Sequence, residues 1–173
     1  MRKSVALVLA VAIIAVAIGY AAHKALSGKA EKSNAASRLL QLSLPDIYGN
    51  PSKLPRLPNK VLVINFWATW CEPCKEEIPA LMRIHRKYAD NGVQIVGIAV
   101  DSADKVRKFY FDFGMNYTVL IGGVETMDLV RELGNRAGGL PFTLVFDRTG
   151  NITIARLGSI TEAELERAIK TLL

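Results

Sequence analysis

The longest apolar stretch of the chain lies near its beginning. From Val5 to Ala22 the sequence reads VALVLAVAIIAVAIGYAA, which is 18 residues without a charged side chain, and Arg2 and Lys3 precede it. As a helix with a rise of ~1.5 Å per residue, this stretch would be roughly 27 Å long, close to the bilayer hydrocarbon thickness of about 30 Å. Basic residues are expected on the cytoplasmic flank of a span. The pattern predicts an uncleaved membrane anchor over residues 1–22, with the rest of the chain on the opposite side of the membrane.

Two other interpretations of this stretch stay open. Gly19, Tyr20 and Ala21 fit the small-x-small pattern of a cleavage site, although the run is longer than the roughly 7–15 apolar residues of a cleavable signal. A helix buried in a soluble domain is the third interpretation, but no polar face interrupts the run. Residues 23–38 are small and polar without a sustained apolar period, which predicts a flexible linker.

From about Leu39 onward, strand-like and helix-like patterns alternate, which predicts one domain over residues 39–173. Turn-rich residues at 44–58 predict a short strand with loops. Buried strands are predicted at 61–67 and 93–100, and a shorter strand at 117–121. Helices are predicted from residue 74 to about residue 90, over 104–113 and over 126–133. A hairpin with a turn at 148–151 follows, and a capping box of Thr161 and Glu164 opens the last helix. This order indicates an α/β layered fold with a mixed sheet.

Charge is unevenly distributed along the chain. The net charge is +6, but residues 1–38 alone carry +5, so the predicted domain is almost balanced at +1. Basic residues beside an apolar helix are typical of contact with lipid headgroups or of topology signals. Nucleic-acid binding is therefore excluded as a function of the domain.

The chain has only two cysteines, Cys71 and Cys74, and they form one C-x-x-C pair. One pair is too few for the disulfide framework of a small secreted protein or for a four-cysteine zinc site. Lys75 stands where haem attachment would require histidine. The sequence also lacks the glycine-rich G-x-G-x-x-G pattern of a dinucleotide site. We expect no metal and no bound cofactor, and a redox-active Cys71–Cys74 disulfide in their place.

The two cysteines are predicted to lie where a buried strand ends and a helix begins. The amino terminus of a helix presents unpaired N–H groups and a partial positive charge, both of which stabilise a thiolate. Cys71 is therefore the expected nucleophile, and Cys74, one turn later, the resolving thiol. Pro73 suits the first turn because its missing N–H would be unpaired there in any case.

The segment Asn65-Phe-Trp-Ala-Thr-Trp-Cys-Glu-Pro-Cys-Lys-Glu-Glu-Ile-Pro-Ala-Leu resembles the active-site segment of the TlpA/ResA group of thioredoxin-like proteins. The resemblance extends over roughly residues 39–173 and includes a helix-and-strand insertion at about 104–121, which this group shares with peroxiredoxins. It implies a thioredoxin fold with a central mixed sheet flanked by helices. It also implies a reductant in the bacterial inner membrane with its catalytic domain on the periplasmic side. The implied partners are a disulfide-bearing protein, with apocytochrome c as a candidate, and a membrane thiol electron donor.

The resemblance further implies roles for individual residues. Pro141, in the loop Gly139-Leu140-Pro141, would follow a cis peptide bond and pack against the cysteines. Glu77 would be a buried carboxylate that helps to deprotonate Cys74. Asn65 departs from the buried aspartate of ordinary thioredoxins, which puts an aspartate-based mechanism in doubt. The residues expected to border the substrate-docking surface are Trp70, Glu72, Pro73 and Leu140.

Other functions remain to be weighed against a reductant. An oxidant or isomerase on the same fold would require a higher reduction potential. A peroxidase would require a P-x-x-x-T-x-x-C spacing, which Thr69 and Cys71 do not provide. A binding or chaperone domain would not require both cysteines. His85 is predicted to be an ordinary residue on the surface of a helix.

Overall fold

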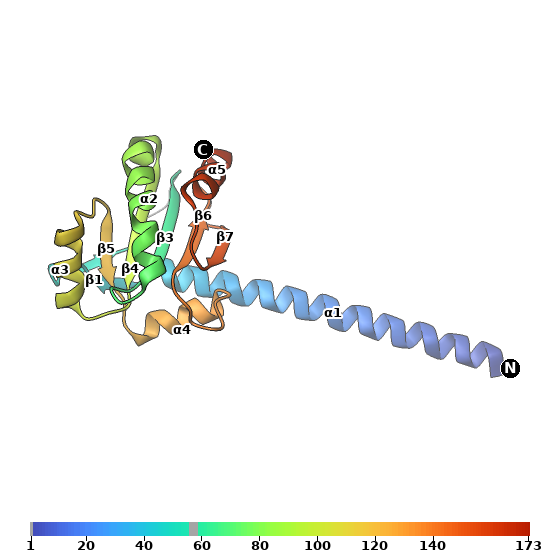
Figure 1. Ribbon diagram of the computed structural model, residues 1–173. Coiled ribbons are helices and arrows are strands. Elements are labelled where there is room, and N and C mark those ends of the chain that lie inside the picture. Colours follow the sequence, from blue (N-terminus) through green and yellow to red (C-terminus); the bar gives the residue numbers. More distant parts are fainter. Residues whose placement is uncertain (1, 56–58) are drawn as a thin grey trace. The chain divides into compact units, whose positions relative to one another are not determined.

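The computed structural model describes residues 2–55 and 59–173, and it divides into two compact units, Met1–Asn34 and Ala35–Leu173. Figure 1 shows the order of the helices and strands along the chain. Their bounds are α1 Arg2–Gln41, β1 Ser43–Pro45, β2 Pro51–Lys53, β3 Val61–Trp67, α2 Glu72–Tyr88, the 3-10 turn η1 Ala89–Asn91, β4 Val93–Ala99, α3 Ala103–Phe113, β5 Thr118–Ile121, α4 Val124–Glu132, β6 Phe142–Phe146, β7 Ile152–Leu157 and α5 Glu162–Leu172.

The structure corrects the expectation of a membrane anchor. The side chains of residues 1–12, where the predicted anchor begins, lie outside the described part of the chain. Among the residues that are described, no helix is long and apolar enough to cross a membrane. A span requires about 20 consecutive apolar residues, whereas α1 continues past Ala22 into a segment with His23, Lys24, Glu31 and Lys32. The predicted single N-terminal span, and the placement of the domain that depended on it, is therefore wrong.

The residues for which the sequence predicts a flexible linker are helical in the structure. They belong to α1, which runs without a break through residues 23–38. Four of its 16 residues are alanine and three are lysine, which favour the helix, and its end is held by packing. Ala35, Ala36 and Leu39 are buried in the core of the second unit, so this unit begins slightly before the predicted boundary at Leu39.

The second unit is built on a five-stranded sheet with the order β5-β4-β3-β6-β7. Strand β3 pairs in parallel with β4 and antiparallel with β6, while β5 is parallel to β4 and β7 antiparallel to β6. Strands β1 and β2 form a separate antiparallel pair. The mixed sheet and the predicted insertion, which corresponds to α3 and β5, are thus confirmed.

The two faces of the sheet support separate cores, because successive side chains of a strand point to opposite faces. Along β3, Val61, Val63 and Trp67 face a first core that includes residues of α2 and α5. Leu62, Ile64 and Phe66 face a second core that includes residues of α4 and the end of α1. Every residue of β3 is buried, as expected of a central strand covered on both faces.

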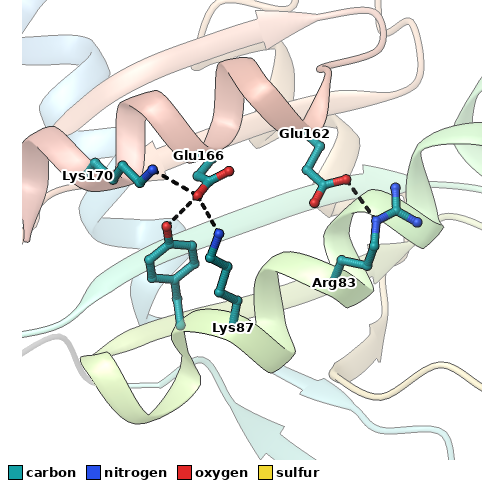
Figure 2. Close-up of polar contacts among 6 residues, drawn as sticks. Arg83, Lys87, Glu162, Glu166 and Lys170 are labelled. Atoms are coloured by element: carbon teal, nitrogen blue, oxygen red, sulfur yellow. Dashed lines mark hydrogen bonds and ion pairs between the residues drawn. The ribbon is translucent and has the colours of Figure 1, made fainter.

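Helices α2 and α5 are joined across the first core by ion pairs (Figure 2). One oxygen of Glu166 on α5 accepts bonds from Lys87 Nζ at 2.8 Å, Lys170 Nζ at 3.0 Å and the Tyr88 hydroxyl at 2.6 Å. Nearby, Arg83 pairs with Glu162 at 2.8 Å. The predicted capping box at Thr161 is also present and fixes the start of α5. These contacts hold α5 against the helix that carries the cysteines.

Candidate functional site

Cys71 and Cys74 lie at the junction between β3 and α2 and form a disulfide with a Cα–Cα distance of 5.3 Å. The chain leaves β3 through a turn over residues 68–71, here called the active-site turn, in which the Cys71 N–H donates to the Ala68 carbonyl at 3.2 Å. Cys71 is the N-cap residue of α2, so it meets the unpaired N–H groups of the first turn. Cys74 is fully buried, while Cys71 is 5% exposed beside the exposed Trp70. Both cysteines are thus buried, and the order in which the two thiols react stays a prediction.

The predicted docking residues lie in the active-site turn and the first turn of α2. The Trp70 side chain is 67% exposed, which is unusual for a large aromatic residue. Pro73 stands in the first turn of α2 as the sequence predicts. Glu72 is exposed and pairs with Lys75 at 2.6 Å within the same helix. The apolar surface of Trp70 and an internally paired charge therefore border Cys71.

The loop before β6 reaches the same end of the sheet. The Leu140–Pro141 peptide bond is cis, as the resemblance implies. Phe142 is paired with Phe66 across β3 and β6, so Pro141 follows the sheet to the point where β3 gives way to the active-site turn. Leu140 is partly buried between the two cores. Pro141 and the cysteines are thus brought to one end of the sheet from segments about 70 residues apart in sequence.

The sequence did not identify the residue that shapes this loop. Asn135 is buried, and its side-chain amide donates to the Gly139 carbonyl at 2.7 Å while its oxygen accepts from the Gly139 N–H at 3.1 Å. This pair of bonds closes the loop immediately before Leu140. An asparagine directly after Gly134 looks like an ordinary helix end, so only the contact with Gly139 distinguishes it.

Glu77 forms a buried polar site on the inner face of α2, only one turn beyond Cys74. Its side chain is 4% exposed, and its two oxygens accept from Asn65 Nδ2 at 2.7 Å and from the Ile160 N–H at 3.0 Å. Asn65 Nδ2 also donates to the Thr143 hydroxyl at 3.1 Å. We call Glu77, Asn65, Thr143 and the Ile160 N–H the Glu77 site. The sequence indicated Glu77 and Asn65, but no local pattern pointed to Thr143 or Ile160.

Burial controls the protonation of Glu77. Removal from water raises the pKa of this carboxyl, and the bonds from Ile160 and Asn65 only partly oppose that rise because they favour the charged form. Glu77 is therefore prepared to take up a proton at a higher pH than an exposed glutamate. Its burial agrees with the expectation from the resemblance, and its part in deprotonating Cys74 remains a prediction.

A second missed contact anchors the active-site turn. The Thr69 hydroxyl donates a hydrogen bond to Asp101, which lies between β4 and α3. Asp101 also accepts from the Ser102 N–H at 2.7 Å and lies 3.6 Å from Lys105 Nζ. Partial burial raises the pKa of Asp101, but the bonds from Thr69 and Ser102 and the charge of Lys105 together hold it below its ordinary value. The turn that presents Trp70 and Cys71 is therefore tied to the neighbouring strand.

No set of three or more histidine, cysteine, aspartate or glutamate side chains is grouped for metal binding in the described part of the chain. The chemistry available at this end of the sheet is that of the cysteine pair and the buried carboxylate.

Comparison with known proteins places the chain among thioredoxin-like proteins. The sequence profile described as AhpC/TSA family matches residues 36–155. The thiol-disulfide oxidoreductase ResA of Geobacillus kaustophilus is 29% identical over 176 residues, covering 99% of each chain. ResA of Bacillus subtilis is 29% identical over 152 residues, covering 87% of this chain and 83% of that protein.

A solved structure agrees with these sequence matches. The thiol:disulfide interchange protein of the thioredoxin family from Chlorobium tepidum superposes with a TM-score of 0.68 at 29% identity, covering 76% of this chain and 92% of that one. The central mixed sheet flanked by helices is therefore a thioredoxin-like fold, as the sequence predicts.

Proposed function

Because the chain belongs to the AhpC/TSA family, and because its only cysteines form a disulfide at the start of α2, we propose that it reduces disulfides in partner proteins. The chain is a thiol–disulfide oxidoreductase of the ResA-like type within that family. The observation that carries the proposal is the position of Cys71, which caps a helix amino terminus beside the exposed Trp70. A thiolate formed there is stabilised by the helix and is the more accessible of the two sulfurs.

The proposed reaction has two exchange steps. In the first, the Cys71 thiolate attacks one sulfur of the partner's disulfide, the bond between the partner's sulfurs breaks, and one partner thiolate leaves. In the second, the Cys74 thiol passes its proton to the Glu77 carboxylate and attacks Cys71, which expels the second partner thiolate. The partner gains two electrons, and the Cys71–Cys74 disulfide is formed.

The substrate and the electron source are the finer part of the proposal. Similarity to the ResA proteins supports a reductant, with apocytochrome c as one candidate substrate. A dithiol donor must reduce the Cys71–Cys74 disulfide again after each turnover, since the reaction consumes both thiols. Trp70, Glu72, Pro73, Leu140 and Pro141 would border the bound substrate.

The reduction potential of the pair tests the direction of the reaction. The full-length protein is equilibrated in dithiothreitol redox buffers, and the Cys71→Ser variant serves as the control that cannot form the disulfide. A potential at or below about −230 mV would support a reductant, whereas a value near about −120 mV would mark an oxidant that introduces disulfides. A protein that passes no electrons to a disulfide substrate would refute the proposal altogether.

The breadth of the AhpC/TSA family makes a peroxidase assay a useful companion experiment. The chain lacks the P-x-x-x-T-x-x-C spacing, and Thr69 is engaged by Asp101. We therefore expect consumption of hydrogen peroxide to be slow relative to disulfide reduction. Rapid, Cys71-dependent peroxide turnover would assign the site to peroxide chemistry instead.

A further inference from the structure

Asn65 is the only residue of strand β3 that is neither aliphatic nor aromatic, and it is fully buried. The register pairs it with Thr143 of β6. Because side chains alternate along a strand, Asn65 lies on the same sheet face as Val63 and Trp67, which belong to the core that includes residues of α2. The sheet therefore presents one amide to the helix that carries the cysteines, and this amide meets Glu77.

The hydrogen bonds of the Asn65 amide are one-sided. Its Nδ2 donates to Glu77 Oε1 at 2.7 Å and to the Thr143 hydroxyl at 3.1 Å. Its Oδ1 is buried and accepts from no group in the described part of the chain. An unsatisfied buried acceptor lowers stability, so an apolar side chain of the same size would serve better if packing were the only role. What Asn65 contributes is a donor aimed at Glu77.

Hydrogen bonds, and not an ion pair, oppose the effect of burial on Glu77. The Ile160 N–H donates to Glu77 Oε2 at 3.0 Å, and this bond and the one from Asn65 both favour the carboxylate. The titratable groups that face Glu77 are Tyr117, just before β5, and Cys74, three residues earlier on α2. Burial raises the pKa of Tyr117, so its hydroxyl stays neutral. Asn65 is therefore the side-chain donor that supports the charged form of Glu77.

We propose that Asn65 is a positioning residue that holds Glu77 in its charged form and so sets the pH above which Cys74 completes the reaction. The inference rests on the proposed function, in which Glu77 takes the proton of Cys74. In that step the Cys74 sulfur bonds to Cys71, the bond from Cys71 to the partner's sulfur breaks, and the partner thiolate leaves with the electron pair. Only an ionised Glu77 can take the proton, and Asn65 acts through Glu77 alone.

The direction of the effect follows from the bond. Burial raises the pKa of Glu77, and the bond from Asn65 partly opposes that rise. Without this donor the pKa is higher still, so Glu77 becomes ionised only at a higher pH. The difference in strength between a bond to a charged acceptor and one to a neutral acceptor corresponds to a change of about tenfold in the protonation equilibrium. Loss of Asn65 should therefore slow the second exchange step in acid and leave it unchanged in base.

The pH profile of the second exchange step tests the proposal. The full-length protein is reduced and mixed with excess dithio-bis-nitrobenzoate, a disulfide probe that releases coloured nitrothiobenzoate. Attack by Cys71 releases the first nitrothiobenzoate, and attack by Cys74 releases the second at a rate that does not depend on the probe concentration. Between about pH 5 and about pH 9, this second rate should rise with pH to a plateau in the wild type. Glu77→Gln should lose this rise, which assigns it to Glu77 and not to the half-buried His85 farther along α2.

Asn65→Leu removes the donor and keeps the side-chain size. We expect its profile to move to higher pH, with release of the second nitrothiobenzoate about tenfold slower on the rising part and equal to the wild type on the plateau. Asn65→Val, a smaller residue suited to a buried strand, should move the profile in the same direction. Asn116→Leu is the matched control, because Asn116 also donates to α2, at the Met82 carbonyl, and also has an unpartnered Oδ1. Its profile should stay in place.

The outcomes separate this inference from the proposed function. If the Asn65 variants slow the second step equally at every pH, Asn65 acts through packing, and the inference is refuted while the reductase stands. If Asn116→Leu moves the profile as far as Asn65→Leu does, the effect is not specific to the bond with Glu77, and the inference is likewise refuted. If the wild type releases no second nitrothiobenzoate, it is the proposed function that fails, and the inference fails with it.

Discussion

Replacing Asn65 by leucine should destabilise the protein only where Glu77 is ionised. Asn65→Leu keeps the side-chain size but removes the bonds to Glu77 and Thr143. A hydrogen bond to a charged group stabilises the fold by about 1.5–3 kcal/mol and a neutral one by about 0.5–1.5 kcal/mol. The Asn65 Oδ1 atom is buried without a partner, so its removal should stabilise the fold by about 1–3 kcal/mol. With mid-range values, the variant is less stable by about 1 kcal/mol when Glu77 carries its charge.

The penalty disappears in acid. The lost bond favours the carboxylate, so its removal raises the pKa of Glu77 above the value already raised by burial. Below the ordinary glutamate pKa of about 4.3, Glu77 is protonated in the folded and unfolded chain, and the charged-bond contribution disappears. The neutral acid still accepts a bond worth about 0.5–1.5 kcal/mol, so the variant should then be about as stable as the wild type, a swing of about 1 kcal/mol between high and low pH.

Urea unfolding of the oxidised proteins at about pH 8 and about pH 3.5 measures this difference on either side of the ordinary glutamate pKa. Thr143→Val is the matched control, because it removes the same neutral bond and leaves the bond to Glu77 in place. Its effect on the free energy of unfolding should be the same at both values of pH. An Asn65→Leu deficit that does not change with pH would refute the claim that this bond supports the charged form of Glu77.

Three further predictions concern the surroundings of the site. The bonds from Lys87, Tyr88 and Lys170 lower the pKa of Glu166 to about 2, so its contribution to stability is present above the ordinary glutamate pKa and is lost as the pH falls toward 2. In Glu166→Gln, the free energy of unfolding in urea should therefore fall less steeply with decreasing pH, and an unchanged pH dependence would argue against this. Thr69→Val and Asp101→Asn should each lower the free energy of unfolding, with a coupling energy of about 1 kcal/mol in a double-mutant cycle. If the two single-variant effects simply add up in the double variant, the bond does not anchor the active-site turn. Gly97→Ala should cost about 1–3 kcal/mol in thermal unfolding because its Cβ would meet Trp67 and Tyr117, whereas Gly28→Ala, with open space around it, should cost nothing.

Local patterns in the sequence were sufficient for most of the fold. The continuous runs of apolar, largely β-branched residues on β3 and β4 identified the buried strands, and the Thr161–Glu164 pair located the start of α5. The cysteines were found because the C-x-x-C pair is a strong local signal, whereas the cis bond before Pro141 was expected only from the family resemblance. These features depend on residues close together in sequence, which is the information that a single sequence carries.

The rest of the site depends on contacts between distant segments. Asn135 and Asp101 look like ordinary loop residues until Gly139 and Thr69 are placed beside them. His85 was predicted to lie on the helix surface, but it is half-buried and its Nδ1 is shielded from solvent. The N-terminal span was inferred from hydropathy, but no helix among the described residues is long and apolar enough to cross a membrane. Such outcomes are set by packing, which no local pattern encodes.

The bond from the Ile160 N–H to Glu77 has a consequence for spectroscopy. Ile160 immediately precedes Thr161, the N-cap of α5, so this one amide connects the start of the last helix to the carboxyl near the redox pair. The chemical shift of its proton should follow the protonation of Glu77, since a bond to a carboxylate is stronger than one to a neutral acid. The backbone N–H resonance of Ile160 therefore reports the protonation state of Glu77, and it can be followed through a titration without modifying either cysteine.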